Sequence, residues 1–259
     1  MWGEPYLGII GSSTAFFFSM WVVPDHLIDK AGEALAKASF PPCKQGRDKC
    51  PTFDKRITHP YPDYHFHTDL TYPEAWPKFS AGVQLYKKPR LFWEFPDPTL
   101  GPPSLNDPYY MLVGDPRIRN DKHMVRCGRG PKPADLYPVK MAVPARYTEA
   151  MILLQIRDVY GQRTLHWEVE QLYLLDPSHI LNLNLDLQDL RTSFRDYAVA
   201  QTTEDDEEAA HRILCRLFLE QKREKNIPPP DRPWDAGEEI KWSEVLREYN
   251  IPFNQSELE

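Results

Sequence analysis

The stretch YLGIIGSSTAFFFSMWVVPDH, residues 6–26, decides how the rest of this chain is interpreted. It holds no lysine, arginine, aspartate or glutamate before Asp25, and its apolar part, Leu7 to Val23, covers 17 residues. A helix needs about 17–25 such residues to cross a bilayer, whereas a run of about 10–14 is more typical of a helix inside a protein core. The stretch therefore predicts a single transmembrane helix within residues 1–24.

The residues in and around this run favour the same interpretation. Trp2, Tyr6 and Trp21 stand near its two ends, where aromatic rings meet lipid headgroups. Small residues within it would let a neighbouring helix approach closely: Gly8, Gly11, Ser12, Ser13 and Ala15. A cleaved signal peptide is disfavoured because no basic residue precedes the run, and a buried core helix is the other alternative.

The charges that follow the run bear on orientation. Basic residues come after it and none precedes it: Lys30, Lys37, Lys44 and Arg47. The positive-inside bias then places the carboxy-terminal part on the matrix, stromal or cytosolic side. Cys43 and Cys50 could instead close a small disulfide loop in an oxidising compartment, or remain thiols in a reduced one. The side of the membrane and the state of these cysteines both stay open.

Proline is the unusual component of the composition. The chain has 26 prolines and 12 glycines, against a usual proline content of roughly 5%, and 18 of the prolines fall within residues 41–144. Helices cannot run through such spacing, while the many aromatic residues argue against disorder. We expect an extended strap that lies on other proteins.

The net charge of -7 argues against nucleic-acid binding.

The expected fold class is mainly α with extended irregular segments. It combines the transmembrane helix, the proline- and aromatic-rich strap and a small α(+β) carboxy-terminal region. The helical signals are an apolar period near residues 148–156 and a charged amphipathic run that Pro228 ends, while alternating leucines at 181–187 indicate a short strand. The predicted segments are 1–24 (membrane helix), 25–40 (short amphipathic helix), 41–144 (strap), 145–200 (small helical or strand segment), 201–227 (charged helix) and 228–259 (tail with a short helix).

One cluster of side chains resembles a metal site. In a strand, His65 and His67 would point to the same side, and with Asp69 they would offer two imidazoles and a carboxylate for zinc or iron. The His-x-His pattern is similar to that of metal-dependent amidohydrolases, but the later strand and helix units of such a barrel are missing. We therefore assign no catalytic, cofactor-binding or metal-binding residue and expect no enzymatic activity, with this cluster as the alternative.

A basic loop at residues 117–132 is the second candidate binding feature. Its charged residues are Arg117, Arg119, Lys122, Arg126, Arg129 and Lys132. Such a loop could bind an anionic lipid headgroup, a phosphate or the acidic surface of a partner protein. The spacing matches neither a Walker A motif nor a dinucleotide-binding fingerprint.

In outline, and by no motif, this organisation is similar to that of supernumerary single-span subunits of mitochondrial energy-transducing complexes. The similarity implies a non-catalytic accessory subunit of a respiratory-chain complex or ATP synthase, acting in assembly and stabilisation as a single-pass protein of the mitochondrial inner membrane. Its partners would be other subunits and membrane lipid, with homo-oligomerisation not the main interaction. A thylakoid or bacterial membrane stays open, as does the identity of the complex. The alternative function is a membrane-anchored metal-dependent enzyme.

Overall fold

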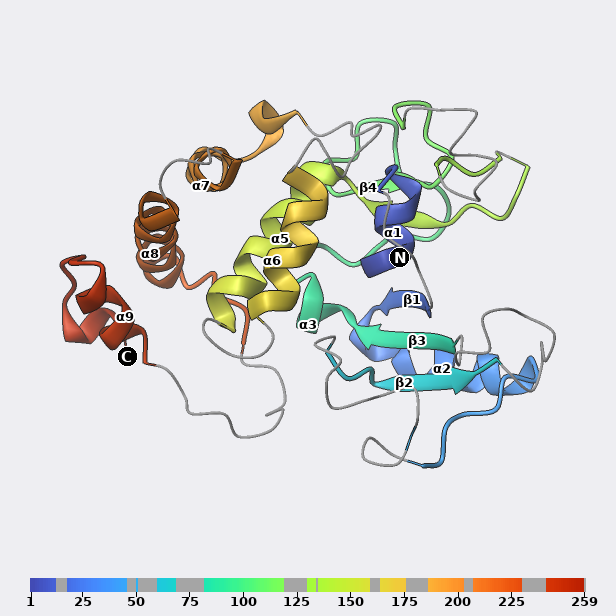
Figure 1. Cartoon of the computed structure of the whole chain (residues 1–259). Coiled ribbons are helices and arrows are strands. Elements are labelled where there is room, and N and C mark those ends of the chain that lie inside the picture. Colours follow the sequence, from blue (N-terminus) through green and yellow to red (C-terminus); the bar gives the residue numbers. More distant parts are fainter. Residues whose placement is uncertain are drawn as a thin grey trace.

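The computed structural model describes most of the chain in several stretches. These are residues 1–12, 18–45, 50, 60–68, 82–118, 130–133, 135–158, 164–175, 186–202, 207–229 and 241–258. Figure 1 shows a small sheet with one helix against it, a central pair of helices, and a further group of helices that leads to the carboxy terminus.

The amino-terminal apolar run does not form a membrane helix. It gives α1 (Gly3–Ile9) and then, after a turn, β1 (Phe18–Val23). Within the described residues, no helix combines the length and apolar character needed to cross a bilayer. The predicted transmembrane helix within 1–24 is therefore wrong, and so is the predicted single-pass localisation in the mitochondrial inner membrane.

The physical reason for this correction lies at the end of α1. Gly11 has a φ of 101°, a value that side chains with a Cβ rarely adopt, and the chain turns back after it. The Trp2 backbone N–H then donates to the Met20 carbonyl at 3.3 Å, which ties the start of α1 to β1. Trp2, Tyr6 and Met20 are completely buried. Much of the described part of the uncharged run, α1 above all, thus lies in a protein core.

The small sheet has three strands in the order β1, β3, β2. β3 (Gly82–Lys87) lies between β1, to which it is parallel, and β2 (Tyr64–His67), to which it is antiparallel. The connection from β1 to β3 carries α2 (Ile28–Lys37), the cysteines at 43 and 50, and β2. α2 is preceded by a short 3-10 turn, η1 (Asp25–Leu27), and lies within the 25–40 segment for which the sequence predicts an amphipathic helix.

The face of the sheet that meets α2 has a small core of its own. Ile28, Phe66 and Leu85 are buried together there, with partly buried side chains around them: Trp21, Val23, Ala31, Leu35, Phe40 and Val83. Tyr64 also points to α2, since its hydroxyl donates to the Asp29 carboxylate at 2.8 Å. Because side chains alternate along β2, His65 and His67 face away from α2.

The proline-rich segment contributes regular structure as well. Besides β2 and β3 it forms α3 (Lys88–Leu91), β4 (Tyr110–Leu112) and β5 (Lys140–Ala142), the last two as an antiparallel pair. Its aromatic residues enter the main core together with those of α1: Tyr86, Phe92, Phe95 and Tyr110. The fold class that the sequence suggested is therefore wrong on this point too, because the described part of the segment forms short elements, and these four rings are buried within the chain itself.

The main core is centred on α5 (Pro144–Arg157) and α6 (Thr164–Leu175), which lie side by side in Figure 1. α5 is buried along nearly its whole length, consistent with its apolar sequence. Tyr147 of α5 stacks on Tyr6 of α1, with ring centroids 3.8 Å apart. The amino-terminal helix is thereby fixed to the centre of the molecule.

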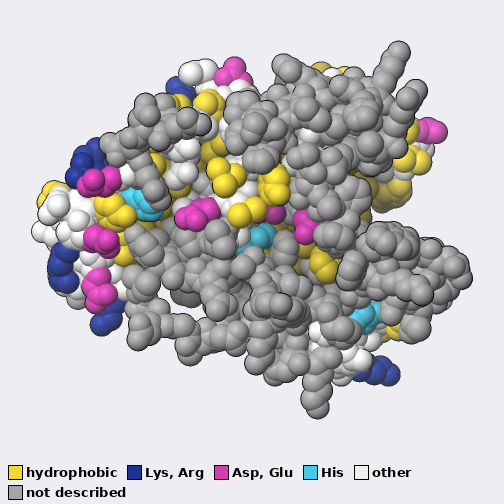
Figure 2. Space-filling model, viewed as in Figure 1, with side chains coloured by type: hydrophobic (Ala, Val, Ile, Leu, Met, Phe, Trp, Pro, Cys, Tyr) yellow, Lys and Arg dark blue, Asp and Glu magenta, His cyan; other side chains and the backbone are white. Residues whose placement is uncertain are grey.

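The carboxy-terminal helices form a second core. They are α7 (Thr192–Thr202), α8 (Glu207–Arg223) and α9 (Trp242–Glu248), with the 3-10 turn η3 (Gln255–Glu257) after α9. A further 3-10 turn, η2 (Leu187–Asp189), precedes α7, and its Leu187 packs against the main core. On the face drawn in Figure 2, charged side chains of both signs gather over α8 and α9. Of the leucines predicted to form a strand, Leu187 lies in η2, and residues 181–185 lie outside the described residues.

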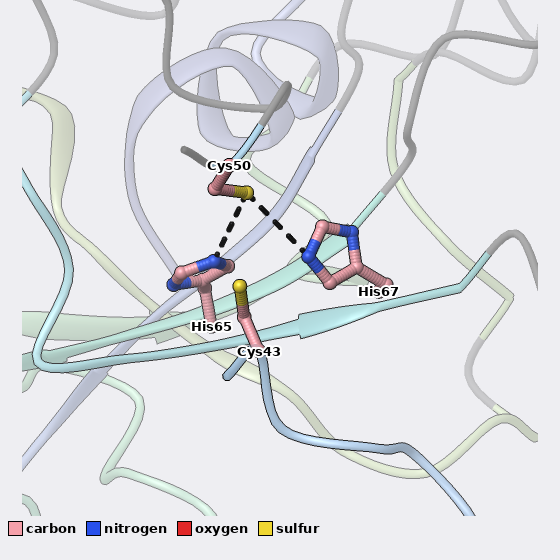
Figure 3. A group of neighbouring side chains, drawn as sticks. All are labelled: Cys43, Cys50, His65 and His67. Atoms are coloured by element: carbon pink, nitrogen blue, oxygen red, sulfur yellow. Dashed lines mark hydrogen bonds between the residues drawn. The ribbon is translucent and has the colours of Figure 1, made fainter. Parts of the chain in front are cut away.

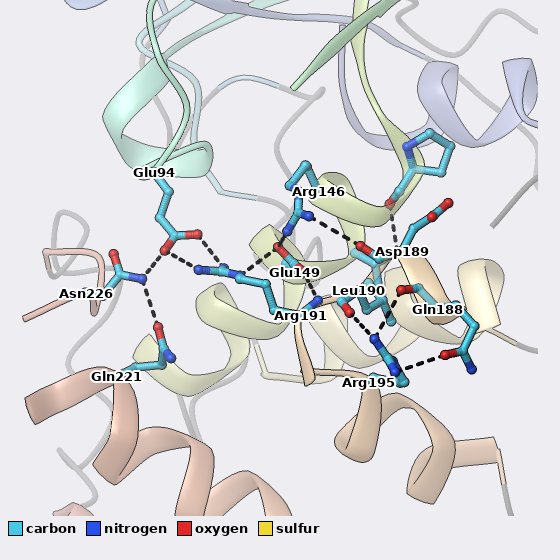
Figure 4. Close-up of polar contacts among 12 residues, drawn as sticks. Glu94, Arg146, Glu149, Gln188, Asp189, Leu190, Arg191, Arg195, Gln221 and Asn226 are labelled. Carbon is cyan, nitrogen blue, oxygen red and sulfur yellow. Dashed lines mark hydrogen bonds and ion pairs between the residues drawn. The ribbon is translucent and has the colours of Figure 1, made fainter. Parts of the chain in front are cut away.

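A polar network joins these parts of the molecule (Figure 4). The Arg191 guanidinium bonds Glu149 of α5 at 3.0 Å and Glu94, beyond α3, at 2.6 Å. The Asn226 amide, beyond α8, donates to the same Glu94 carboxylate. The Glu149 side chain is 2% exposed, so Arg191 supplies much of the compensation that a buried carboxylate requires.

Candidate metal centre

Four side chains that are well separated in the sequence meet beside β2. They are Cys43, Cys50, His65 and His67, and Figure 3 shows all four pointing into one small space. The two histidines share this space because residues two apart on a strand face the same side.

The approach of Cys43 is fixed by the backbone. Its N–H donates to the His65 carbonyl at 3.0 Å, and the preceding residue, Pro42, forms an antiparallel bridge with Phe66. The segment after α2 is therefore aligned along β2 like a further short strand. This alignment brings one thiol beside the two imidazoles.

The distances within the cluster match a tetrahedral metal site. The Cys50 Sγ lies 3.4 Å from the His65 Nε2 and 3.5 Å from the His67 Nε2, and all four potential ligand atoms lie within 4.8 Å of one another. A tetrahedral Zn²⁺ ion, with bonds of about 2.3 Å to sulfur and about 2.0 Å to nitrogen, separates a sulfur and a nitrogen ligand by about 3.5 Å. The donor atoms are thus spaced as such an ion requires.

The surroundings favour the metal-binding forms of two ligands. The Gln45 backbone N–H donates to the Cys43 Sγ at 3.4 Å, and a hydrogen bond of this kind stabilises a thiolate. Burial, with a smaller contribution from the neighbouring His67, lowers the pKa of His65 to about 4. His65 is therefore a neutral imidazole at neutral pH, which is the form that binds a metal ion.

Burial distinguishes the members of the cluster. Cys50 is 3% exposed and His65 is 8% exposed, whereas Cys43 and His67 are half-buried. A buried thiol between two imidazoles is poorly placed to attack an external substrate, since a catalytic cysteine needs access. It is well placed to bind an ion that the protein encloses.

The sequence pointed to only half of this centre. His65 and His67 were recognised as potential ligands, but Asp69, expected beside them, lies outside the described residues. Cys43 and Cys50 were considered as a possible disulfide or as two thiols, without a part in a metal site, and in the structure both are thiols. The order Cys-x6-Cys followed by His-x-His is the available signal, but its spacing differs from that of common zinc motifs.

The basic loop at 117–132 is described only at its two ends. Arg117 makes a two-pronged ion pair with Asp115, at 2.9 Å and 2.8 Å, which lowers the pKa of that carboxyl through the guanidinium hydrogen bond. The other arginines and Lys122 lie outside the described residues. The predicted binding of an anionic headgroup is therefore left as a prediction, with the Arg117 charge already compensated.

A second surface feature is a groove of about 260 Å³ between β1 and β5, here called the β1–β5 groove. Its lining is mostly apolar and includes Trp21 and Val22 on one side and Tyr137 and Met141 on the other. Tyr137 is 86% exposed. Large apolar side chains that are exposed beside a groove are typical of surfaces that bind other proteins.

The donor set decides what the centre can do. Two thiolates and two imidazoles suit zinc, and they fill a tetrahedral coordination sphere, whereas catalytic zinc sites have three protein ligands and leave one position for water or substrate. The geometry therefore favours a structural ion.

Comparisons of the chain with protein family models, with curated proteins and with solved structures find no match.

Proposed function

We propose that this chain is a zinc-binding, non-catalytic protein in which Cys43, Cys50, His65 and His67 hold a structural Zn²⁺ ion, and that it acts as an accessory component of a larger protein assembly. The observation that carries the proposal is the spacing of the four donor atoms. It agrees with tetrahedral zinc at both distances from the Cys50 sulfur to the histidine nitrogens.

The small core on the opposite face of the sheet explains why an ion would be needed. Ile28, Phe66 and Leu85 are its buried residues, and each contributes about 1.5–3 kcal/mol on burial. Such a core is small for ordering a helix and a strand, and small domains of this kind are commonly stabilised by a metal. A structural zinc site supplies about 10–16 kcal/mol of apparent binding free energy.

The metal-dependent enzyme that the sequence left as an alternative has less support. It would use His65 and His67 with Asp69 and would keep one coordination position open for a substrate. The four side chains that converge here include two cysteines and need no carboxylate to complete the set. A closed site favours the structural role.

The accessory role rests on the β1–β5 groove and on exposed apolar residues that follow one of its lining residues in the sequence. Leu100 is completely exposed and Leu105 is 73% exposed, and Pro98 and Tyr137 line the groove. A partner that covers such apolar side chains would gain the free energy of their burial. The assembly that the sequence analysis favours, a respiratory-chain complex or ATP synthase, stays a prediction within this proposal.

The test is to measure the metal content of the full chain. Protein purified under reducing conditions and supplied with Zn²⁺ is expected to retain one equivalent after gel filtration. Replacement by Co²⁺ is expected to give the strong visible absorption of tetrahedral cobalt with thiolate ligands. Cys50→Ser should lose both signals, while Cys215→Ser, in α8, should keep them. A reduced parent protein that retains no zinc would overturn the proposal.

A further inference from the structure

We propose that this zinc centre is also a redox switch: a peroxide oxidises Cys43 and Cys50 to a disulfide, and the ion is released. The inference rests on the proposed function, because it needs the two thiolates to be zinc ligands. It adds a regulatory property to a site that would otherwise be only structural.

The sulfur atoms are close enough for this reaction. The Cys43 and Cys50 Sγ atoms lie within 4.8 Å of each other, and a tetrahedral zinc ion would hold them about 3.8 Å apart. A disulfide requires about 2.0 Å. Oxidation therefore requires the two sulfur atoms to approach each other by about 1.8 Å.

Exposure gives the two cysteines different roles. Cys43 is half-buried and Cys50 is 3% exposed, so a small oxidant in solution reaches Cys43 first. Cys50 then acts as the resolving thiol. Zinc ligation would hold both cysteines as thiolates, the reactive form of a cysteine.

Cys215 provides the contrast within the described residues. It lies in α8, is 2% exposed, and burial raises its pKa to about 11. It therefore remains a protonated thiol at neutral pH and reacts slowly with peroxide. The geometry confines the oxidation to the metal centre among the described cysteines.

The reaction balances without a further reagent. The Cys43 thiolate attacks one peroxide oxygen, the oxygen–oxygen bond breaks, and the leaving hydroxide takes a proton to become water while Cys43 becomes a sulfenic acid. The Cys50 thiolate then attacks the Cys43 sulfur and displaces hydroxide, which takes a second proton. Two thiolates lose two electrons, the peroxide becomes two waters, and Zn²⁺ leaves because only His65 and His67 remain as ligands.

The experiment uses the full chain with Cys127→Ser and Cys215→Ser, so that only the two site cysteines can react, with the unsubstituted chain in parallel. The zinc-loaded protein is treated with hydrogen peroxide, a chromogenic chelator measures released zinc, and peptide mass spectrometry measures the oxidation state of each cysteine. We expect one zinc released per disulfide formed between Cys43 and Cys50. Dithiothreitol with added zinc should restore the starting state.

The outcomes separate the two proposals. If the reduced protein binds no zinc, the proposed function fails and the switch fails with it. If the reduced protein binds zinc but peroxide releases none, or releases it while leaving Cys43 as a sulfinic acid without a disulfide, only the switch is overturned. Zinc release that matches disulfide formation and reverses on reduction supports both.

Discussion

The backbone N–H of Cys43 donates to the carbonyl of His65 at 3.0 Å, so a thiol-bearing residue and an imidazole-bearing residue are aligned by the backbone alone. The bond holds Cys43 alongside β2, on the strand that carries both imidazoles of the proposed zinc centre.

Removal of one ligand should abolish tight zinc binding. We expect His67→Ala to weaken zinc affinity by more than about 100-fold, since changes to residues that only support a ligand already cost about 10–100-fold. Competition with a chromogenic chelator measures the effect. His26→Ala is the matched control, because His26 lies in η1 near the same sheet with a side chain that is 67% exposed. Equal affinity in both variants would contradict the assigned ligand set.

Zinc removal should loosen one part of the molecule only. Chelation is expected to speed hydrogen exchange in α2 and β2, whose small core has few buried residues. The amides of α5, buried in the main core, should exchange as before. Hydrogen exchange with mass spectrometry on the zinc-loaded and chelated full chain makes the comparison. Uniformly faster exchange across both regions would show that the ion stabilises the whole chain instead.

Loss of the Arg191 side chain should destabilise the protein. Arg191→Met removes the guanidinium bonds to Glu149 and Glu94 and leaves Glu149 with Arg146 and the backbone N–H of residue 191. Since a buried carboxylate loses a partner, the free energy of unfolding should fall by about 2–4 kcal/mol. Urea denaturation measures it. Arg212→Met breaks an exposed pair with Glu208 and should cost less than about 0.5 kcal/mol; similar losses in both variants would refute this role of Arg191.

Cys215 should make stability fall at alkaline pH. Its pKa is raised by burial from 9.0 to about 11, so above about pH 9 the unfolded thiol ionises while the folded one stays protonated. The unfolded state then binds fewer protons, and stability declines from about pH 9 to about pH 11. The parent should lose about 1 kcal/mol more than Cys215→Ser between pH 8 and pH 10. Denaturation at the two pH values measures the change, and an equal loss of unfolding free energy in the parent and the variant would argue against a raised pKa for Cys215.

The β1–β5 groove should be needed for association with a partner and dispensable for folding. Tyr137→Asp places a charge on a side chain that is 86% exposed, so the melting temperature should barely change. The desolvation of the new carboxylate at an interface would be unfavourable. The parent is expected to migrate in a large complex when native extracts of its source cells are separated by size, and the variant to migrate near its own mass. Leu172→Asp, on the exposed side of α6, is the control, and identical migration of Tyr137→Asp and the parent would contradict the assigned surface.

Local signals in the sequence located several helices. The apolar period near residues 148–156 predicted a helix where α5 lies, and the charged run ending before Pro228 predicted one where α8 lies. In both segments the apolar residues recur with the period of a helix, and this spacing can be recognised from the local sequence alone. The apolar run at Leu7 to Val23 was misread, because hydropathy measures the cost of exposure to water and does not distinguish lipid from a protein core. The β-branched pair Val22 and Val23, at the end of β1, was the local sign of a strand.

The metal centre shows a similar division. The spacing of His65 and His67 predicted that they share a face, because the period of a strand is local. Their meeting with Cys43 and Cys50 depends on the way the segment after α2 pairs with β2, and such pairing is decided by tertiary structure. The burial of aromatic residues from the proline-rich segment, among them Phe92, also depends on tertiary structure, so the local sequence did not predict it.

The parallel pairing of β1 with β3 has a consequence for the order of folding events. The strands are separated by residues 24–81, and the four ligands all lie within this connection. An ion that joins Cys43 to His67 shortens the loop to be closed by nearly half, which changes the closure free energy by only about 0.6 kcal/mol. Long-range parallel pairing is slow, and an ion bound before β3 pairs with β1 would speed that step by at most about threefold.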